Sequence, residues 1–179
     1  MSVFLSKSEI DELIANNILE LIHYRYIKGI DKSNILNIIK NRDIKVFNNF
    51  LIGYVNEKEL NTFINKINNY KYTNGIIILS DINFEKYDFS KDTLYKKNIN
   101  IFTKDEFYEI YVKSTYYQKH VIISEEEFKK SFPNILINQL PLITHWDKAV
   151  RYIGGKVGEI VKIYRHNVSG ESIYYRLIK

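Results

Sequence analysis

The chain has 179 residues, of which 45% are hydrophobic and 26% charged, and its formal net charge at pH 7 is +5. These proportions are ordinary for a globular protein and exclude general disorder. No apolar run approaches the roughly 20 residues of a membrane-spanning helix, and the lack of cysteine excludes disulfides and thiolate metal sites. With no secretory signal pattern at the N-terminus, the sequence predicts an intracellular protein without membrane association.

Two amphipathic helices are predicted at the start of the chain. Ser8 is the expected N-cap of the first, because acidic residues follow it in the opening turn and apolar residues then recur at helical spacing. Gly29 is the expected C-cap, and Ser33 opens a shorter second helix. The apolar face of the first helix consists of Ile10, Leu13, Ile14, Ile18, Leu21 and Ile22.

Strand-like runs then alternate with helical ones as far as residue 116. Residues 76–79 are all apolar and predict a buried central strand. The alternation of strands and helices predicts an α/β domain. The other predicted strands are 45–52 and 98–102, and the predicted helices are 57–70, 92–97 and one that begins at Thr103.

A second, smaller unit is predicted from residue 117, where a strand at 120–123 precedes a helix that ends near residue 132. Ser124 and Glu127 have the spacing of a capping box. A further helix at 146–153 ends at Gly154. Strands at 159–165 and 172–178 are expected to form a hairpin around a turn at 167–170. We therefore expect two domains, 1–116 and 117–179, the second a small α+β domain.

Positive charge is concentrated in the predicted second domain. Residues 1–116 contain 16 Lys and Arg against 15 Asp and Glu, whereas residues 117–179 contain 10 against 6. The sequence as a whole is rich in residues with AT-rich codons, yet three of its five Arg and four of its seven Gly lie in residues 139–179. Because Gly provides backbone freedom and Arg a rigid donor fork, specific turns and contacts are expected in this tract.

The same tract carries a series of residues at fixed spacings. In order they are Gln139-Leu140-Pro141, Asp147, Arg151-Tyr152, Gly154, Lys156, Gly158, Ile160-Val161-Lys162-Ile163, Arg165 and Tyr175-Arg176. This series resembles the C-terminal module of the RNA polymerase subunit 5 family, which comprises the fifth subunit shared by eukaryotic RNA polymerases I, II and III and its archaeal counterpart. Lys148 stands where the family has proline, a local departure from the pattern.

The resemblance implies a non-catalytic subunit of a multisubunit DNA-directed RNA polymerase, with no cofactor of its own. Its C-terminal assembly domain would anchor it to the largest subunit among the other core subunits. Residues 1–116 have the length and element order of the jaw domain that eukaryotic members carry, so the implied fold is a jaw with helices around a small sheet followed by an α+β assembly domain.

The resemblance also implies where the subunit acts. The jaw would lie beside downstream double-stranded DNA, and its near-neutral charge implies weak, non-specific contact. Catalysis, with its magnesium, would belong to the two largest subunits. A cellular member would reside in the nucleus. A member encoded by a large DNA virus, with which the AT-rich composition is compatible, would act in viral factories of the host cytoplasm and be carried in the virion.

Docking residues follow from the resemblance as well. For each basic residue in this set, the alternative to a docking role is a side chain that lies on the solvated surface. Because neighbours in a strand point to opposite faces, one of Tyr174 and Tyr175 is expected to be buried and the other available. Ser80 and Lys86, after the buried strand, are candidates to lie near DNA. The candidate docking residues are Arg151, Tyr152, Lys156, Lys162, Arg165, Tyr175 and Arg176.

Two other functions stay open at this point. The segment 155–163 has the glycine-punctuated pattern of small RNA-binding barrels in ribosomal and elongation proteins, which would predict autonomous RNA binding with a steep salt dependence. The family's jaw is similar in fold to restriction-type nucleases, and Asp81, Glu85 and Lys86 offer a sparse version of their metal-binding set. The four His are scattered without a second ligand at metal spacing, so no metal site and no catalytic residue are predicted.

Overall fold

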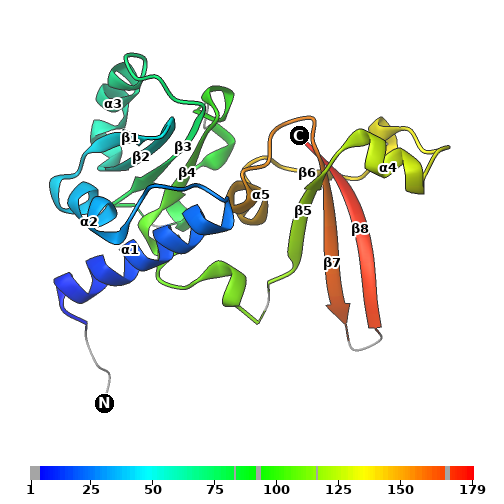
Figure 1. Ribbon diagram of the computed structural model, residues 1–179, viewed down its shortest axis with the longest axis horizontal. Coiled ribbons are helices and arrows are strands. Elements are labelled where there is room, and N and C mark those ends of the chain that lie inside the picture. Colours follow the sequence, from blue (N-terminus) through cyan, green and yellow to red (C-terminus); the bar gives the residue numbers. More distant parts are fainter. Residues whose placement is uncertain (1–4, 83, 92–93, 116, 168–169) are drawn as a thin grey trace. The chain divides into compact units, whose positions relative to one another are not determined.

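The structure, a computed structural model, describes residues 5–82, 84–91, 94–115, 117–167 and 170–179. The chain divides into two compact units, Met1–Lys113 and Ser114–Lys179. Each unit combines helices with a four-stranded sheet, which confirms the predicted α+β class (Figure 1). Within the described residues, no helix has both the length and the apolar character needed to cross a membrane.

A mixed sheet with strand order β1-β2-β3-β4 forms the centre of the N-terminal unit. Strands β2, β3 and β4 are parallel, whereas β1 is antiparallel to β2. Every residue of β3 after its first is buried, which confirms the predicted buried central strand. The strands are β1 (Ile44–Phe47), β2 (Phe50–Val55), β3 (Asn74–Leu79) and β4 (Ile99–Thr103).

The single strand predicted at 45–52 is wrong, because the chain reverses direction inside it. Asn48 and Asn49 both have positive φ, at 46° and 66°. Asparagine tolerates this left-handed conformation better than most residues, so the pair forms the two-residue turn of a β1–β2 hairpin. The apolar run that reads as one strand is therefore divided between two antiparallel partners.

Helices α1 (Lys7–Tyr24) and α2 (Lys32–Asn41) pack on each other. The predicted N-cap Ser8 is wrong, since the Ser6 side chain accepts from the Glu9 N–H and the Glu9 carboxylate accepts from the Ser6 N–H at 2.7 Å. This reciprocal pair is a capping box. The second helix is likewise capped by Asp31 rather than Ser33.

The remaining predicted helices of this unit are short and largely of the 3₁₀ type. The helix predicted at 57–70 is a 3₁₀ turn, Glu57–Glu59, followed by α3 (Leu60–Ile67). The one predicted at 92–97 is a 3₁₀ helix at Leu94–Lys97, and residues 92–93 lie outside the described residues. The helix predicted to begin at Thr103 is the 3₁₀ helix Lys104–Phe107. The first helix also ends at Tyr24, before the predicted C-cap Gly29.

The C-terminal unit has the strand order β5-β7-β8-β6. Strands β7 and β8 pair antiparallel along their whole length, which confirms the predicted hairpin; residues 168–169 of the predicted turn lie outside the described residues. Its elements are β5 (Lys119–Ile123), α4 (Glu125–Ser131), β6 (Leu142–Ile143), α5 (Lys148–Ile153), β7 (Ile160–Asn167) and β8 (Gly170–Ile178).

This sheet has a small core on each face. On one face, Phe128 of α4 packs with Ile123 and Ile160, and we call this the α4 face. On the other, Val150 of α5 packs with Val161 and Ile163, and we call this the α5 face. Because α4 and α5 are only seven and six residues long, they cover one end of the sheet, and the hairpin end of β7 and β8 reaches past them (Figure 1).

Candidate partner-binding surface

Arg151 and Tyr152, both candidates for the docking surface, are buried in the structure. The exposed fraction of Arg151 is 2% and that of Tyr152 is 4%. The Arg151 Nε donates to the backbone carbonyl oxygen of Trp146 at 2.9 Å. This bond holds the residues just before α5 in place and gives Arg151 a structural role, while the docking role of both side chains stays a prediction.

Arg165 lies on the open part of the α5 face and is held there on two sides. Its Nε donates to the Gln118 side-chain oxygen at 3.1 Å, and its guanidinium carbon lies 4.4 Å from the ring centroid of Tyr174. Tyr174 is 42% exposed. A stacked, hydrogen-bonded guanidinium loses little further freedom on binding, so Arg165 is preorganised for an acidic partner.

Arg176 lies on the same face but closer to the core. It is opposite Val161 in the register, and its Nη1 donates to the Leu142 carbonyl oxygen at 2.9 Å. This bond ties β8 to the short strand β6. Arg176 is half-buried, and the tie to Leu142 gives it a structural role in addition to the predicted docking role.

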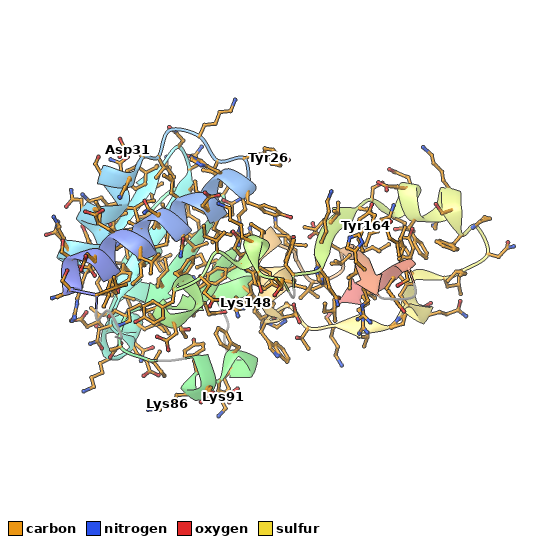
Figure 2. The ribbon with its side chains drawn as sticks, turned by 90° about the horizontal axis from the view of Figure 1, so that it is seen from below. Tyr26, Asp31, Lys86, Lys91, Lys148 and Tyr164 are labelled. Carbon is orange, nitrogen blue, oxygen red and sulfur yellow. The ribbon has the colours of Figure 1, made fainter. Side chains whose placement is uncertain are left out.

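Lys162 lies on the α4 face, opposite Tyr175. Its Nζ is 5.2 Å from the ring centroid of Tyr164, and the Lys119 Nζ is 5.7 Å from the same ring. The side-chain hydrogen bond with Tyr164 raises the pKa of Lys162, so the ammonium stays charged. Ile173, opposite Tyr164, is 49% exposed. Two cations, a phenol ring and an aliphatic side chain therefore share this part of the sheet; Tyr164 is marked in Figure 2.

Tyr175 packs into the α4-face core, whereas Tyr174 is exposed on the other face. The Tyr175 ring lies 5.4 Å from that of Phe128 and 5.2 Å from that of Phe132, both in edge-on geometry. The two tyrosines lie on opposite faces as predicted, with Tyr175 half-buried and Tyr174 exposed. Tyr175 contributes to the packing of the domain, and its predicted docking role stays a prediction.

The seven predicted docking residues do not form one patch. Lys162 and Tyr175 lie on the α4 face, Arg165 and Arg176 on the α5 face, and Lys156 is exposed in the turn between α5 and β7. Sequence reasoning missed Lys119, Tyr164 and Ile173. The register of the hairpin is the signal that could have found them, since residues directly opposite each other share a face. We call Lys119, Lys162, Tyr164, Arg165, Ile173 and Tyr174 the hairpin surface.

In the N-terminal unit, the two residues predicted to lie near DNA follow β3. Ser80 is half-buried, and its N–H donates to the Val55 carbonyl oxygen at 2.9 Å. Lys86 is exposed at the end of the 3₁₀ helix Phe84–Lys86 and projects outward in the same loop as Lys91 (Figure 2). Only Lys86 of the original pair thus lies fully at the surface.

The carboxylates of the nuclease alternative do not gather into a site. The Asp81 carboxylate accepts from the Glu57 N–H at 2.8 Å, which caps the 3₁₀ turn before α3. In the part of the chain that the structure describes, no group of three or more His, Cys, Asp or Glu side chains could hold a metal ion. Asp81 has a structural role, and the nuclease alternative gains no support.

His120 is a buried titratable group beside the hairpin surface. Its Nδ1 lies 2.5 Å from the Gln118 carbonyl oxygen. Burial lowers the pKa of His120 and outweighs the opposing effects of that carbonyl and of Asp147, while Arg165 and Arg176 lower it further. The neutral ring is therefore the folded form.

A lowered pKa in the folded state predicts that acid destabilises the C-terminal unit. The contribution of His120 is fully present above its ordinary pKa of about 6.5 and is lost progressively as the pH falls from there through the lowered pKa of the folded state, because in that range the unfolded chain binds a proton that the folded chain does not. We expect urea unfolding followed by Trp146 fluorescence to show a lower midpoint at pH 5.5 than at pH 7.5. His120→Phe should reduce that difference, and an unchanged difference would assign the effect to other groups.

Comparison with known proteins identifies the C-terminal unit. Residues 111–178 match the family model described as RNA polymerase Rpb5, C-terminal domain. The DNA-directed RNA polymerase subunit Rpo5 of Methanosarcina acetivorans is 44% identical over 63 residues, which are 34% of this chain and 81% of the relative. The Rpo5 proteins of Archaeoglobus fulgidus and Methanocaldococcus jannaschii are 41% and 40% identical over 63 residues, 34% of this chain in each case and 83% and 81% of those relatives.

The C-terminal unit is thus a domain of the RNA polymerase subunit type, and the match confirms the resemblance seen in residues 139–179. The chain belongs to the RNA polymerase subunit 5 family.

Proposed function

We propose that this chain is a non-catalytic subunit of a multisubunit DNA-directed RNA polymerase. The observation that carries the proposal is that the matched segment, residues 111–178, coincides with the compact unit Ser114–Lys179. A whole domain is shared with relatives that are named as polymerase subunits, rather than a short motif. Catalysis would lie in the largest subunits of the complex, and a viral or a cellular source stays a prediction.

The C-terminal unit, with residues 117–179 as its minimal extent, would anchor the chain to the largest subunit. The hairpin surface suits this role because Arg and Tyr are over-represented among the residues that dominate protein interfaces. Arg165 and Tyr174 form one such pair on the α5 face, and the α4 face adds Lys119 and Lys162 around Tyr164. The excess of positive charge in this unit favours an acidic docking surface.

The N-terminal unit, residues 1–116, would form the lower jaw beside downstream DNA. Its 16 basic against 15 acidic residues allow few phosphate contacts. Lys86 is a candidate for such a contact because it is exposed at the end of a short 3₁₀ helix. The jaw would therefore help to hold the duplex within the assembled enzyme, by charge and without reading bases.

Co-purification from the native source tests this function. A tagged full-length chain should retain the largest polymerase subunit and the other core subunits, identified by mass spectrometry. The double variant Arg165→Ala with Tyr174→Ala should reduce that recovery by about tenfold or more, because it removes two interface anchors. Lys129→Ala is the matched control, since Lys129 is exposed on α4 and paired with Glu125 at 2.6 Å, away from the hairpin surface.

The fragments separate the roles of the two units. Residues 117–179 should co-purify with the largest subunit and residues 1–116 should not. The opposite result would overturn the assignment of anchor and jaw. Recovery of RNA without polymerase subunits would instead favour the RNA-binding alternative.

A further inference from the structure

The outer edge of β8 is unpaired over most of its length. Strand β8 has nine residues and is covered by β7 on one side throughout. On the other side lies β6, which has two residues and pairs only with Leu177 and Ile178. Among the described residues, no strand lies against the outer edge of residues 170–176. An edge of this kind presents backbone N–H and C=O groups that a further strand could pair with.

The side chains on this edge are apolar rather than protective. Ile173 is 49% exposed on the α4 face and Tyr174 is 42% exposed on the α5 face. Residues 172–175, Ser-Ile-Tyr-Tyr, contain no charge and no proline, the features with which natural proteins usually protect an exposed edge. The other edge strand, β5, differs because it begins with Lys119 and presents no large exposed hydrophobic side chain among the described residues.

The charges around the edge indicate what kind of chain would cover it. On the α5 face, Arg165 of β7 lies 4.4 Å from the ring centroid of Tyr174 on β8. On the α4 face, Lys162 of β7 lies beside Tyr164, and Lys119 lies one strand further from the edge, on β5. The acid nearest the hairpin end, Glu171, lies 3.1 Å from the His166 Nδ1, which forms an ion pair with it only when that histidine is protonated. A partner strand with Asp or Glu side chains would be attracted from both faces, whereas a second copy of this chain would bring the same cations.

We propose that an extended, acidic segment of the largest polymerase subunit pairs with the outer edge of β8 and becomes an additional strand of the C-terminal sheet. This inference rests on the proposed function and specifies how the anchoring is made. In strand addition, backbone hydrogen bonds supply the affinity, and alternate side chains of the added strand supply the specificity. Here one set of alternate side chains would lie against Ile173 and the other against Tyr174.

Hydrogen–deuterium exchange on the full chain, free and within purified polymerase, tests the backbone pairing directly. In the free chain, the amides of residues 171–175 that point away from β7 should exchange rapidly. In the polymerase, these amides should slow by about 100-fold or more, because amides in paired strands exchange only when the structure opens. The amides of β5 provide the internal control and should change little.

A variant separates backbone pairing from general burial. Ile173→Glu places a negative charge on the edge, where an acidic strand would be repelled, and should both lower the recovery of polymerase subunits and abolish the added protection, while the free variant retains the exchange pattern of β7. Tyr164→Phe, which keeps the ring and leaves the edge unchanged, should retain the protection. If Ile173→Glu retains it as well, the pairing is not made at this edge.

Each other outcome decides against the inference in a distinguishable way. If the chain assembles into polymerase while residues 171–175 exchange as they do when free, the strand addition is wrong and the proposed function stands. If the chain does not assemble, the proposed function fails and the inference fails with it. If a short RNA alone protects these amides, the edge binds RNA rather than a polymerase segment. If raising the concentration of the chain alone protects them and forms a dimer, the edge binds a second copy of the chain.

Discussion

Replacing Arg151 with alanine should lower the free energy of unfolding of the C-terminal unit by about 3 kcal/mol. The side chain is 2% exposed, and its Nε donates to the Trp146 carbonyl oxygen at 2.9 Å. Alanine would leave that partly buried carbonyl without this donor and would create a cavity beside the short helix α5. Both effects lower the free energy of unfolding. The cavity matters in particular because a helix of six residues is stabilised by its packing rather than by its own helical propensity.

Trp146 makes this measurement specific to one unit. It is the only Trp of the chain, it lies in the C-terminal unit, and its own carbonyl is the acceptor. Urea unfolding followed by its fluorescence should show the loss in Arg151→Ala. Arg165→Ala, which removes a half-exposed arginine held by Gln118, should cost less than about 1 kcal/mol. Equal stability of Arg151→Ala and wild type would show that Arg151 has no structural role and would favour its docking role.

The positions of Arg151 and Arg165 show what the sequence could and could not predict about the site. Residue type and spacing were enough to identify the family, because the tract 139–179 retains Arg and Gly in a sequence rich in other residues. They were not enough to divide structural from docking roles. Arg151 bonds the Trp146 carbonyl oxygen five residues earlier in the chain, a contact that residue type alone does not reveal, whereas Arg165 stays near the surface because it lies beyond the end of the α5-face core.

The fold was predictable where a single pattern dominates. The strand at 76–79 and the hairpin of β7 and β8 follow from apolar runs and period-two alternation. The errors occurred where a short polar signal competes with a longer apolar one. Asn48 and Asn49 interrupt an otherwise strand-like run, and Ser6 outcompetes Ser8 because only Ser6 has a glutamate three residues later that returns a hydrogen bond.

The open edge of β8 could not be predicted from the sequence, because strand pairing joins residues that are far apart along the chain. The sequence predicts that β8 exists but not that its outer neighbour is limited to Leu142 and Ile143. That limit exposes Ile173 and Tyr174, which composition alone would place in a core. An assembly surface of this kind is visible only when the register of the hairpin and the length of its neighbour are both known.

Replacing Gly75 with alanine should destabilise the N-terminal unit by about 3 kcal/mol. Gly75 pairs with Leu51 across the parallel strands β2 and β3, and an added Cβ would lie 2.6 Å from the Leu51 carbonyl oxygen and 2.7 Å from its Cβ. The carbonyl belongs to the backbone of an adjacent strand, so the clash requires the sheet itself to shift. The small gain that alanine provides by restricting the unfolded chain, about 0.4–1 kcal/mol, cannot offset this.

Gly53→Ala is the matched control for Gly75→Ala, because it adds the same methyl group to the same sheet. Its Cβ would meet the Ile44 Cγ1 at 3.0 Å and the Ile77 Cγ1 at 3.3 Å, both in side chains that can adjust, so the loss should be near 1 kcal/mol. Hydrogen exchange of the β3 amides reports the N-terminal unit, and Trp146 fluorescence reports the other. Gly75→Ala should accelerate the hydrogen exchange of the β3 amides far more than Gly53→Ala does. Equal effects of the two variants would show that the backbone of β2 at Leu51 shifts as easily as the side chains of Ile44 and Ile77 adjust.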